Sequence, residues 1–206
     1  MNISDTIISE QKYSGMWVEV KDTEPQRAIL YIHGGGFVIG SPKSHHELMS
    51  RLAVSANAKA LGLDYRRAPE NTFPALIEGI MRAYRWMLES DIEPKQIVIA
   101  GDSCGGGLSI AALILIRDEG LPQPACAACL SPWSDLECAG ESMKQNERIR
   151  FSCTARKVAG IGKDLSEWCR SSLSSCVYHS CRSLRTITCV NPDRRCRDAA
   201  YRCCST

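Results

Sequence analysis

A short glycine-flanked serine motif, GDSCG at residues 101–105, lies between two apolar segments. The preceding segment, Gln96–Ala100, has the length and composition of a buried strand, and the following one, Leu108–Ile116, is long enough for a helix. A G-x-S-x-G pattern between a strand and a helix is typical of a sharp turn that lifts a serine hydroxyl out of a sheet. The motif therefore favours a fold in which strands and helices alternate.

A second glycine-rich motif, HGGGF at residues 33–37, follows another short apolar run, Ala28–Ile32. The backbone N–H groups of such a loop can stabilise the oxyanion that forms when a serine attacks a carbonyl. Each motif alone has another interpretation, because HGGG can be a plain loop and a glycine-rich turn can hold a phosphate. Their order, each after a strand, favours acyl hydrolysis by Ser103. A nucleotide site is disfavoured because G-x-G-x-x-G spacing and a Walker lysine are absent.

The rest of the first 146 residues continues the alternation. Apolar runs predict four buried strands: Ala28–Ile32, Ala58–Leu63, Gln96–Ala100 and Ala125–Leu130. Helices are predicted from Ser44 to about Asn57, from Pro74 onward and from about Gly105 to Arg117, with Ser44 and Glu47 in the spacing of a capping box. Continuously apolar strands separated by helices predict a mostly parallel sheet with helices on both faces.

The composition changes near residue 147. Residues 1–150 carry 15 Lys and Arg against 19 Asp and Glu, whereas residues 151–206 carry 10 against 4 and hold eight of the 12 cysteines. No helical or strand periodicity persists in this part. We therefore divide the chain into a core at 1–146 and a Cys-, Ser- and Arg-rich tail at 147–206. The hypotheses for the tail are disorder and a shift of the reading frame.

The overall composition points to no unusual partner. A net charge of +2 gives no reason to expect nucleic acid, although a short basic cluster at 194–197 leaves a nucleic-acid- or metal-binding tail as a lesser alternative. No apolar run approaches the roughly 20 residues that span a bilayer, and no signal peptide is visible, so we predict a cytoplasmic protein without a membrane partner.

Cys126 and Cys129 are three apart on a predicted strand and point to opposite faces, which favours core thiols over a metal site. We expect no metal and no cofactor.

Five stretches from about Gln26 to Asn146 resemble the hormone-sensitive-lipase branch of the α/β-hydrolases, especially its bacterial esterases. They are YIHGGGFVIGS at 31–41, LDYRRAPE at 63–70, FPA at 73–75, GDSCGGGL at 101–108 and LSPWSD at 130–135. The resemblance implies an α/β-hydrolase fold, here incomplete at both ends compared with family members. It also implies a carboxylesterase whose partner is a small-molecule ester with a short acyl group.

The same resemblance implies roles for individual residues. Ser103 corresponds to the nucleophile that forms an acyl-enzyme, and the N–H groups of Gly34, Gly35 and Cys104 correspond to the oxyanion hole. Cys104 stands where the family usually has alanine. Because only its N–H is needed and its side chain is small, we interpret this as a tolerated change.

The base that activates the serine is the missing part of the pattern. The family supplies an acid and a histidine from its later half, and neither family motif is present after residue 146. Asp164 and His179 occur in the right chain order and are the triad candidates. His33, His45 and His46 are expected to have structural or solvated roles. The alternative function is therefore a catalytically impaired esterase remnant that lacks the family's acid and histidine.

Overall fold

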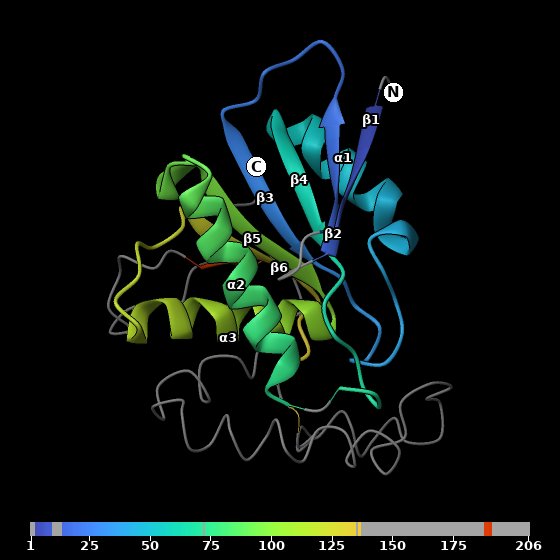
Figure 1. Cartoon of the computed structure of the whole chain (residues 1–206), viewed down its shortest axis with the longest axis vertical. Coiled ribbons are helices and arrows are strands. Elements are labelled where there is room, and N and C mark those ends of the chain that lie inside the picture. The colour runs from blue at the N-terminus through green and yellow to red at the C-terminus, as the bar shows by residue number, and fades with distance from the viewer. Residues whose placement is uncertain (1–2, 10–13, 72, 135, 137–187, 191–206) are drawn as a thin grey trace, which may run out of the picture.

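The computed structural model describes residues 3–9, 14–71, 73–134, 136 and 188–190 (Figure 1). Its strands form one mixed sheet in the order β1-β2-β4-β3-β5-β6-β7. The pairs β3–β4, β3–β5 and β5–β6 are parallel, and β1, β2 and β7 pair antiparallel with their neighbours. The strands are β1 Ile3–Ser9, β2 Ser14–Val20, β3 Arg27–Ile32, β4 Ala58–Leu63, β5 Ile97–Asp102, β6 Cys126–Leu130 and β7 Thr188–Val190.

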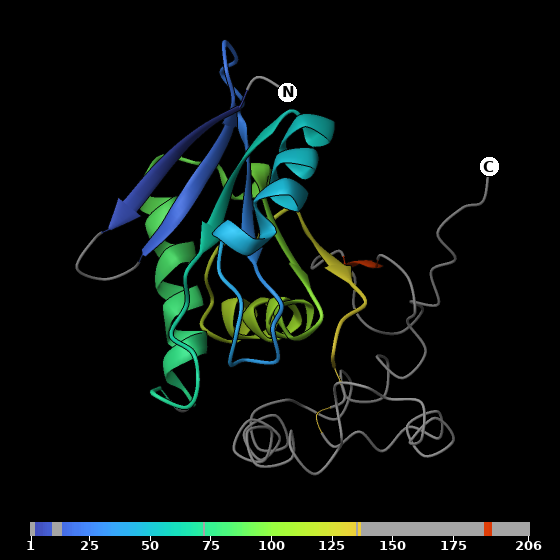
Figure 2. The same cartoon turned by 90° about the vertical axis from the view of Figure 1, so that its right-hand side faces the viewer.

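Helices cover both faces of this sheet, as Figures 1 and 2 show. Helix α1 (His46–Ala56) packs on one face, and α2 (Ala75–Glu89) and α3 (Cys104–Asp118) pack on the other. Short 3-10 turns at Lys43–His45 and Pro94–Gln96 precede α1 and β5. The predicted mostly parallel, doubly covered α/β-hydrolase-type sheet is confirmed. Among the described residues, no helix is both long and apolar enough to cross a membrane.

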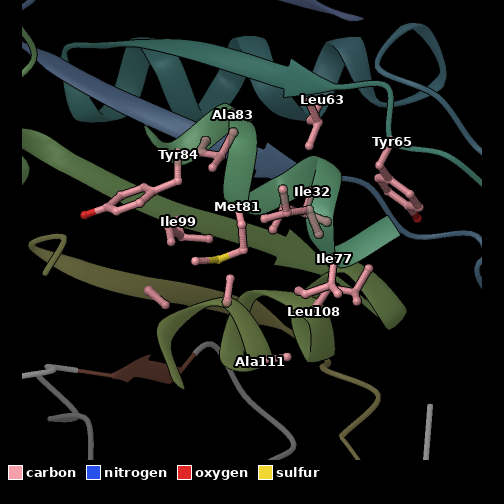
Figure 3. Packing of buried hydrophobic residues seen from close by; sticks show 14 of the residues in the cluster. Ile32, Leu63, Tyr65, Ile77, Met81, Ala83, Tyr84, Ile99, Leu108 and Ala111 are labelled. Atoms are coloured by element: carbon pink, nitrogen blue, oxygen red, sulfur yellow. The ribbon is translucent and has the colours of Figure 1, made fainter. Parts of the chain in front are cut away.

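The apolar residues that the sequence assigns to strands and helices form two cores, one on each side of the sheet. Met49 and Ala53 of α1 bury Val18 and Tyr31 of the sheet on one side. The larger core on the other side joins the sheet to α2 and α3 (Figure 3). Its members include Ile32, Leu63, Ile77, Met81, Ile99 and Leu108.

The four predicted strands are present, and β5 runs two residues further than expected, to Asp102. Strands β1 and β2 were not predicted. In β1, at the edge of the sheet, only Ile3, Ile7 and Ile8 are apolar, so the segment lacks the apolar run that marks the central strands. Strand β7 falls in the tail, where no strand was predicted, and the other tail residues lie outside the described part of the chain.

The predicted capping box at Ser44 is wrong. Ser44 belongs to the 3-10 turn that precedes α1, and the residue at the helix N-cap is His45, which makes no side-chain capping bond. The Ser44 hydroxyl instead donates to the Ser41 carbonyl at 2.8 Å and accepts from the Ser41 N–H at 2.9 Å. These bonds close the turn before the helix. Because the Ser44 hydroxyl bonds to the backbone of Ser41, it does not cap the N-terminus of α1.

Candidate active site

The two glycine motifs meet because their strands are neighbours. Ile32, the last residue of β3, pairs in parallel with Gly101 of β5. Parallel neighbours end at the same edge of a sheet, so the loops that follow them must lie side by side. The Gly34 N–H donates to the Asp102 carboxylate at 2.9 Å, which joins the two loops directly.

Ser103 lies in a backbone conformation that few residues other than glycine adopt. Its φ is 52° and its ψ is −121°. Such a conformation persists only where the surroundings fix it. Here the Ser103 N–H donates to the Leu130 carbonyl at 2.9 Å, and the Ser103 carbonyl accepts from the Trp133 N–H at 2.7 Å. The turn between β5 and α3 is therefore held by the end of β6 and leaves Ser103 partly exposed at the carboxyl edge of the sheet.

Helix α3 begins at Cys104, immediately after Ser103. Its first backbone bond runs from the Gly107 N–H to the Ser103 carbonyl at 3.2 Å, so the N–H groups ahead of Gly107 have no acceptor within the helix. The helix dipole adds positive potential at this end. The Cys104 N–H therefore lies where a negative charge on a substrate oxygen next to Ser103 would be stabilised.

The side chain of Cys104 is buried beneath this turn. Burial raises the pKa of its thiol, and the smaller opposing effects come from the backbone of Phe37 and Gly36 and from the Tyr65 hydroxyl. The Tyr65 oxygen lies 3.9 Å from the sulfur. A buried thiol with a raised pKa stays protonated at neutral pH and is a poor nucleophile.

The glycine loop after β3 folds back on itself. Gly35 and Gly36 have φ values of 125° and 62°, which side chains rarely permit. The Gly35 carbonyl accepts from the N–H groups of Val38 and Ile39 at 3.2 and 3.0 Å. Phe37 then anchors the loop, because its carbonyl accepts from the Ala68 N–H at 2.9 Å and its side chain is buried.

The hydrogen bond from Gly34 to Asp102 corrects one expectation. Gly34 was expected to donate to the oxyanion, but its N–H already has a carboxylate acceptor in this structure. Gly35 and Cys104 remain as candidate donors. The correction has a simple cause: Asp102, the unspecified position of the G-x-S-x-G pattern, reaches across to the neighbouring strand end.

His33 is buried and has a structural environment. Only 1% of its surface is exposed, its ring stacks on Tyr65 with centroids 4.3 Å apart, and Nδ1 lies 2.7 Å from the Gly34 carbonyl. Because a carbonyl only accepts, Nδ1 carries the proton, and Nε2 is buried without a hydrogen-bond partner. Burial lowers the pKa of His33, so the ring is neutral at physiological pH.

This burial predicts acid sensitivity. The unfolded chain protonates His33 near pH 6.5, whereas the folded chain resists protonation, so stability is complete above that pH and falls below it. The loss is at most about 1.4 kcal/mol per pH unit. We expect the free energy of unfolding in urea to drop by about 1 kcal/mol more for the wild type than for His33→Gln between pH 7.5 and 5.5. If the free energy of unfolding fell by the same amount in both proteins between these pH values, the result would contradict this role of His33.

The other two early histidines also contact structural partners. His45 Nδ1 lies 3.2 Å from the Ser41 carbonyl, and its Nε2 lies 3.6 Å from Asp102 Oδ1. His46 Nε2 lies 2.9 Å from Asp5 Oδ1, which joins α1 to β1. These contacts agree with the structural roles expected for both residues.

The remaining predicted site residues give a mixed outcome. Asp164 and His179 lie outside the described residues. Within the described part, no cluster of three or more His, Cys, Asp or Glu side chains could hold a metal. The buried Cys129 and the partly exposed Cys126 follow the alternation of β6, as predicted.

Comparison with known proteins gives the family. A family model described as alpha/beta hydrolase fold matches residues 29–182. The chain belongs to the α/β-hydrolase family. The matched range runs past Asn146, where the resemblance read from the sequence motifs ends.

Several bacterial proteins are similar to this α/β-hydrolase. An acetyl-hydrolase of Streptomyces hygroscopicus is 51% identical over 136 residues, which is 65% of this chain and 46% of that protein. An esterase of Acinetobacter venetianus is 36% identical over 120 residues, covering 58% of this chain and 40% of its own length. A crystal structure of an esterase from the bacterial hormone-sensitive lipase family has a TM-score of 0.73 and 40% identity, covering 78% of this chain and 54% of that one. This α/β-hydrolase chain thus resembles that bacterial branch and spans about half the length of these relatives.

Two site residues were missed by sequence reasoning. Tyr31 was treated only as part of an apolar strand, and Asp102 only as the unspecified residue of the G-x-S-x-G pattern. The Tyr31 hydroxyl donates to Asp102 Oδ1 at 2.7 Å, and burial together with this bond raises the pKa of Tyr31. The available signal was a tyrosine one residue before the end of a buried strand, because its hydroxyl needs a partner when the ring is buried.

Proposed function

We propose that this α/β-hydrolase is a carboxylic-ester hydrolase that acts on short acyl esters through Ser103 and an acyl-enzyme. The observation that carries the proposal is the pairing of β3 with β5, which places the HGGG loop beside the Ser103 turn. The relatives named acetyl-hydrolase and esterase support the same reaction class. A small-molecule ester is the partner that this chemistry requires.

The proposed reaction uses the two motifs in turn. A base takes the Ser103 proton while the oxygen attacks the ester carbonyl, and the same proton then passes to the departing alcohol. The N–H groups of Gly35 and Cys104 donate to the oxyanion in both tetrahedral intermediates, where one lost donor costs about 3–4 kcal/mol. Water then attacks the acyl-Ser103 ester and releases the acid. His179 as the base and Asp164 as its acid partner are the candidates that chain order provides.

The direct test is hydrolysis of p-nitrophenyl acetate and p-nitrophenyl butyrate by the full chain and by Ser103→Ala. A short-acyl hydrolase favours the two-carbon and four-carbon esters over a long-chain ester such as the palmitate. Ester hydrolysis that requires Ser103 supports the proposal, and equal rates for the two proteins would reject it.

Cys104 is predicted to contribute only its backbone to the reaction. Cys104→Ala keeps the N–H and removes a buried sulfur, so we expect kcat/KM to change by less than about threefold while the free energy of unfolding falls by about 1 kcal/mol. Ester hydrolysis and urea denaturation measure the two effects. A loss of activity above tenfold in a variant that still folds would assign the thiol a role in the chemistry.

A further inference from the structure

The carboxylate of Asp102 gathers groups from three separate segments. Its Oδ1 accepts from the Tyr31 hydroxyl of β3 at 2.7 Å and from the Gly34 N–H of the glycine loop at 2.9 Å. The same oxygen lies 3.6 Å from Nε2 of His45, in the turn before α1. Asp102 itself is the last residue of β5 and directly precedes Ser103. One oxygen atom therefore links the serine turn to the glycine loop.

The position of Gly34 explains why the hydrogen bond to Asp102 requires a glycine. A side chain at residue 34 would overlap the Asp102 carboxylate, since a Cβ built there lies 3.0 Å from Cγ and closer still to Oδ2. Only glycine lets the backbone approach the carboxylate this closely. The bond fixes the first peptide of the loop, and the two glycines that follow turn the chain through positive φ values. The direction of the Gly35 N–H thus depends on where Gly34 is held.

We propose that Asp102 is a positioning residue that holds the glycine loop in register with Ser103. This inference rests on the proposed function, because the loop is useful only if Gly35 donates to an oxyanion. Donors act at 2.7–3.1 Å from the oxyanion, and a displacement of about 1 Å can cost about 100-fold in rate. Asp102 contributes by its acceptor oxygen and not by contact with the ester.

The first measurement needs no catalysis and no variant. In the full wild-type chain, amide hydrogen exchange followed by NMR should show the Gly34 N–H at least about 100-fold slower than an unprotected peptide, as a hydrogen-bonded amide is. Exchange of Gly34 at the unprotected rate would overturn the proposal.

Variants then separate the acceptor oxygen from general stability. Asp102→Ala removes the acceptor, and we expect exchange in the peptide at 33–40 to accelerate at least tenfold while the β4 peptide at 58–63 stays unchanged. Asp102→Asn keeps an oxygen in place, and Tyr31→Phe keeps the bond to Gly34, so both should leave the loop within about twofold of wild type. Any of three results would overturn the proposal. Exchange in the loop could be unchanged in Asp102→Ala, or exchange in β4 could accelerate as much as in the loop. In the third, the loop of Asp102→Asn or Tyr31→Phe would exchange as fast as that of Asp102→Ala.

Kinetics distinguish this inference from the proposed function. If the chain hydrolyses p-nitrophenyl acetate, Asp102→Ala should lower kcat at least tenfold with KM changed less than about threefold, because the loop acts on the transition state. Asp102→Asn should restore most of kcat, and failure to do so would count against positioning. If wild type and Ser103→Ala are equally inactive, the proposed function fails, and the exchange measurements alone decide whether Asp102 holds the loop.

Discussion

Replacing Ser103 with alanine is expected to reduce hydrolysis of p-nitrophenyl acetate by about a thousandfold or more. The hydroxyl is the group of Ser103 that would form the proposed acyl-enzyme, and the variant keeps the N–H groups of the proposed oxyanion hole. Alanine also fits the space of the serine, so the fold should be retained. The measurement is kcat/KM for the ester, together with a mass shift at Ser103 after brief exposure to an organophosphate that mimics the tetrahedral intermediate.

Ser90→Ala is the matched control for this experiment. Its hydroxyl donates to the Trp86 carbonyl at 2.8 Å at the exposed end of α2, so the substitution removes one serine oxygen without touching the proposed site. We expect wild-type activity from this variant and thermal unfolding of both variants close to wild type. Equal background rates for wild type and Ser103→Ala, with no mass shift in wild type, would instead identify the impaired remnant that lacks a working base.

The central part of the fold could be predicted because its signals are local. Strand β4 is an apolar run interrupted only by Lys59, and its other residues are buried in the interior of the sheet, so its limits could be predicted from composition. Helix α2 carries buried residues such as Ile80, Tyr84 and Met87 at helical spacing. The first turn of α3 is fixed by the serine motif that precedes it. Each of these elements is specified by residues within a few positions of one another.

The edge strands and the carboxylate link could not be predicted for the opposite reason. Four of the seven residues of β1 are polar, and this strand forms because it pairs with β2 along its whole length. The bond between Gly34 and Asp102 joins residues far apart in the chain, and only the register of β3 against β5 brings them together. The sequence motifs predicted which two loops form the candidate site, but not which N–H group in them already donates to a carboxylate.

The largest expected effect on stability comes from Gly105→Ala. A Cβ at this position would overlap the Ile32 carbonyl and lie 2.7 Å from the His33 carbonyl. Both are backbone atoms at the end of β3, which is paired on both sides and has little freedom to move. The gain of about 1 kcal/mol in helix propensity from replacing glycine cannot offset this overlap. We expect the free energy of unfolding to fall by about 3 kcal/mol or more, with a matching loss of soluble protein.

Gly79→Ala isolates the effect of the overlap, because it makes the same substitution inside α2 where a Cβ meets no atom within 4 Å. The added methyl group should raise the free energy of unfolding by about 0.5–1 kcal/mol through helix propensity alone. Urea denaturation of both variants gives the comparison. A fall in the free energy of unfolding for Gly105→Ala and a rise for Gly79→Ala would show that the start of α3 packs tightly against the end of β3. This contact keeps the Ser103 turn beside the glycine loop. A Gly105→Ala protein as stable as Gly79→Ala would mean that this contact is looser than the structure describes, and the proposed oxyanion hole would lose this structural support.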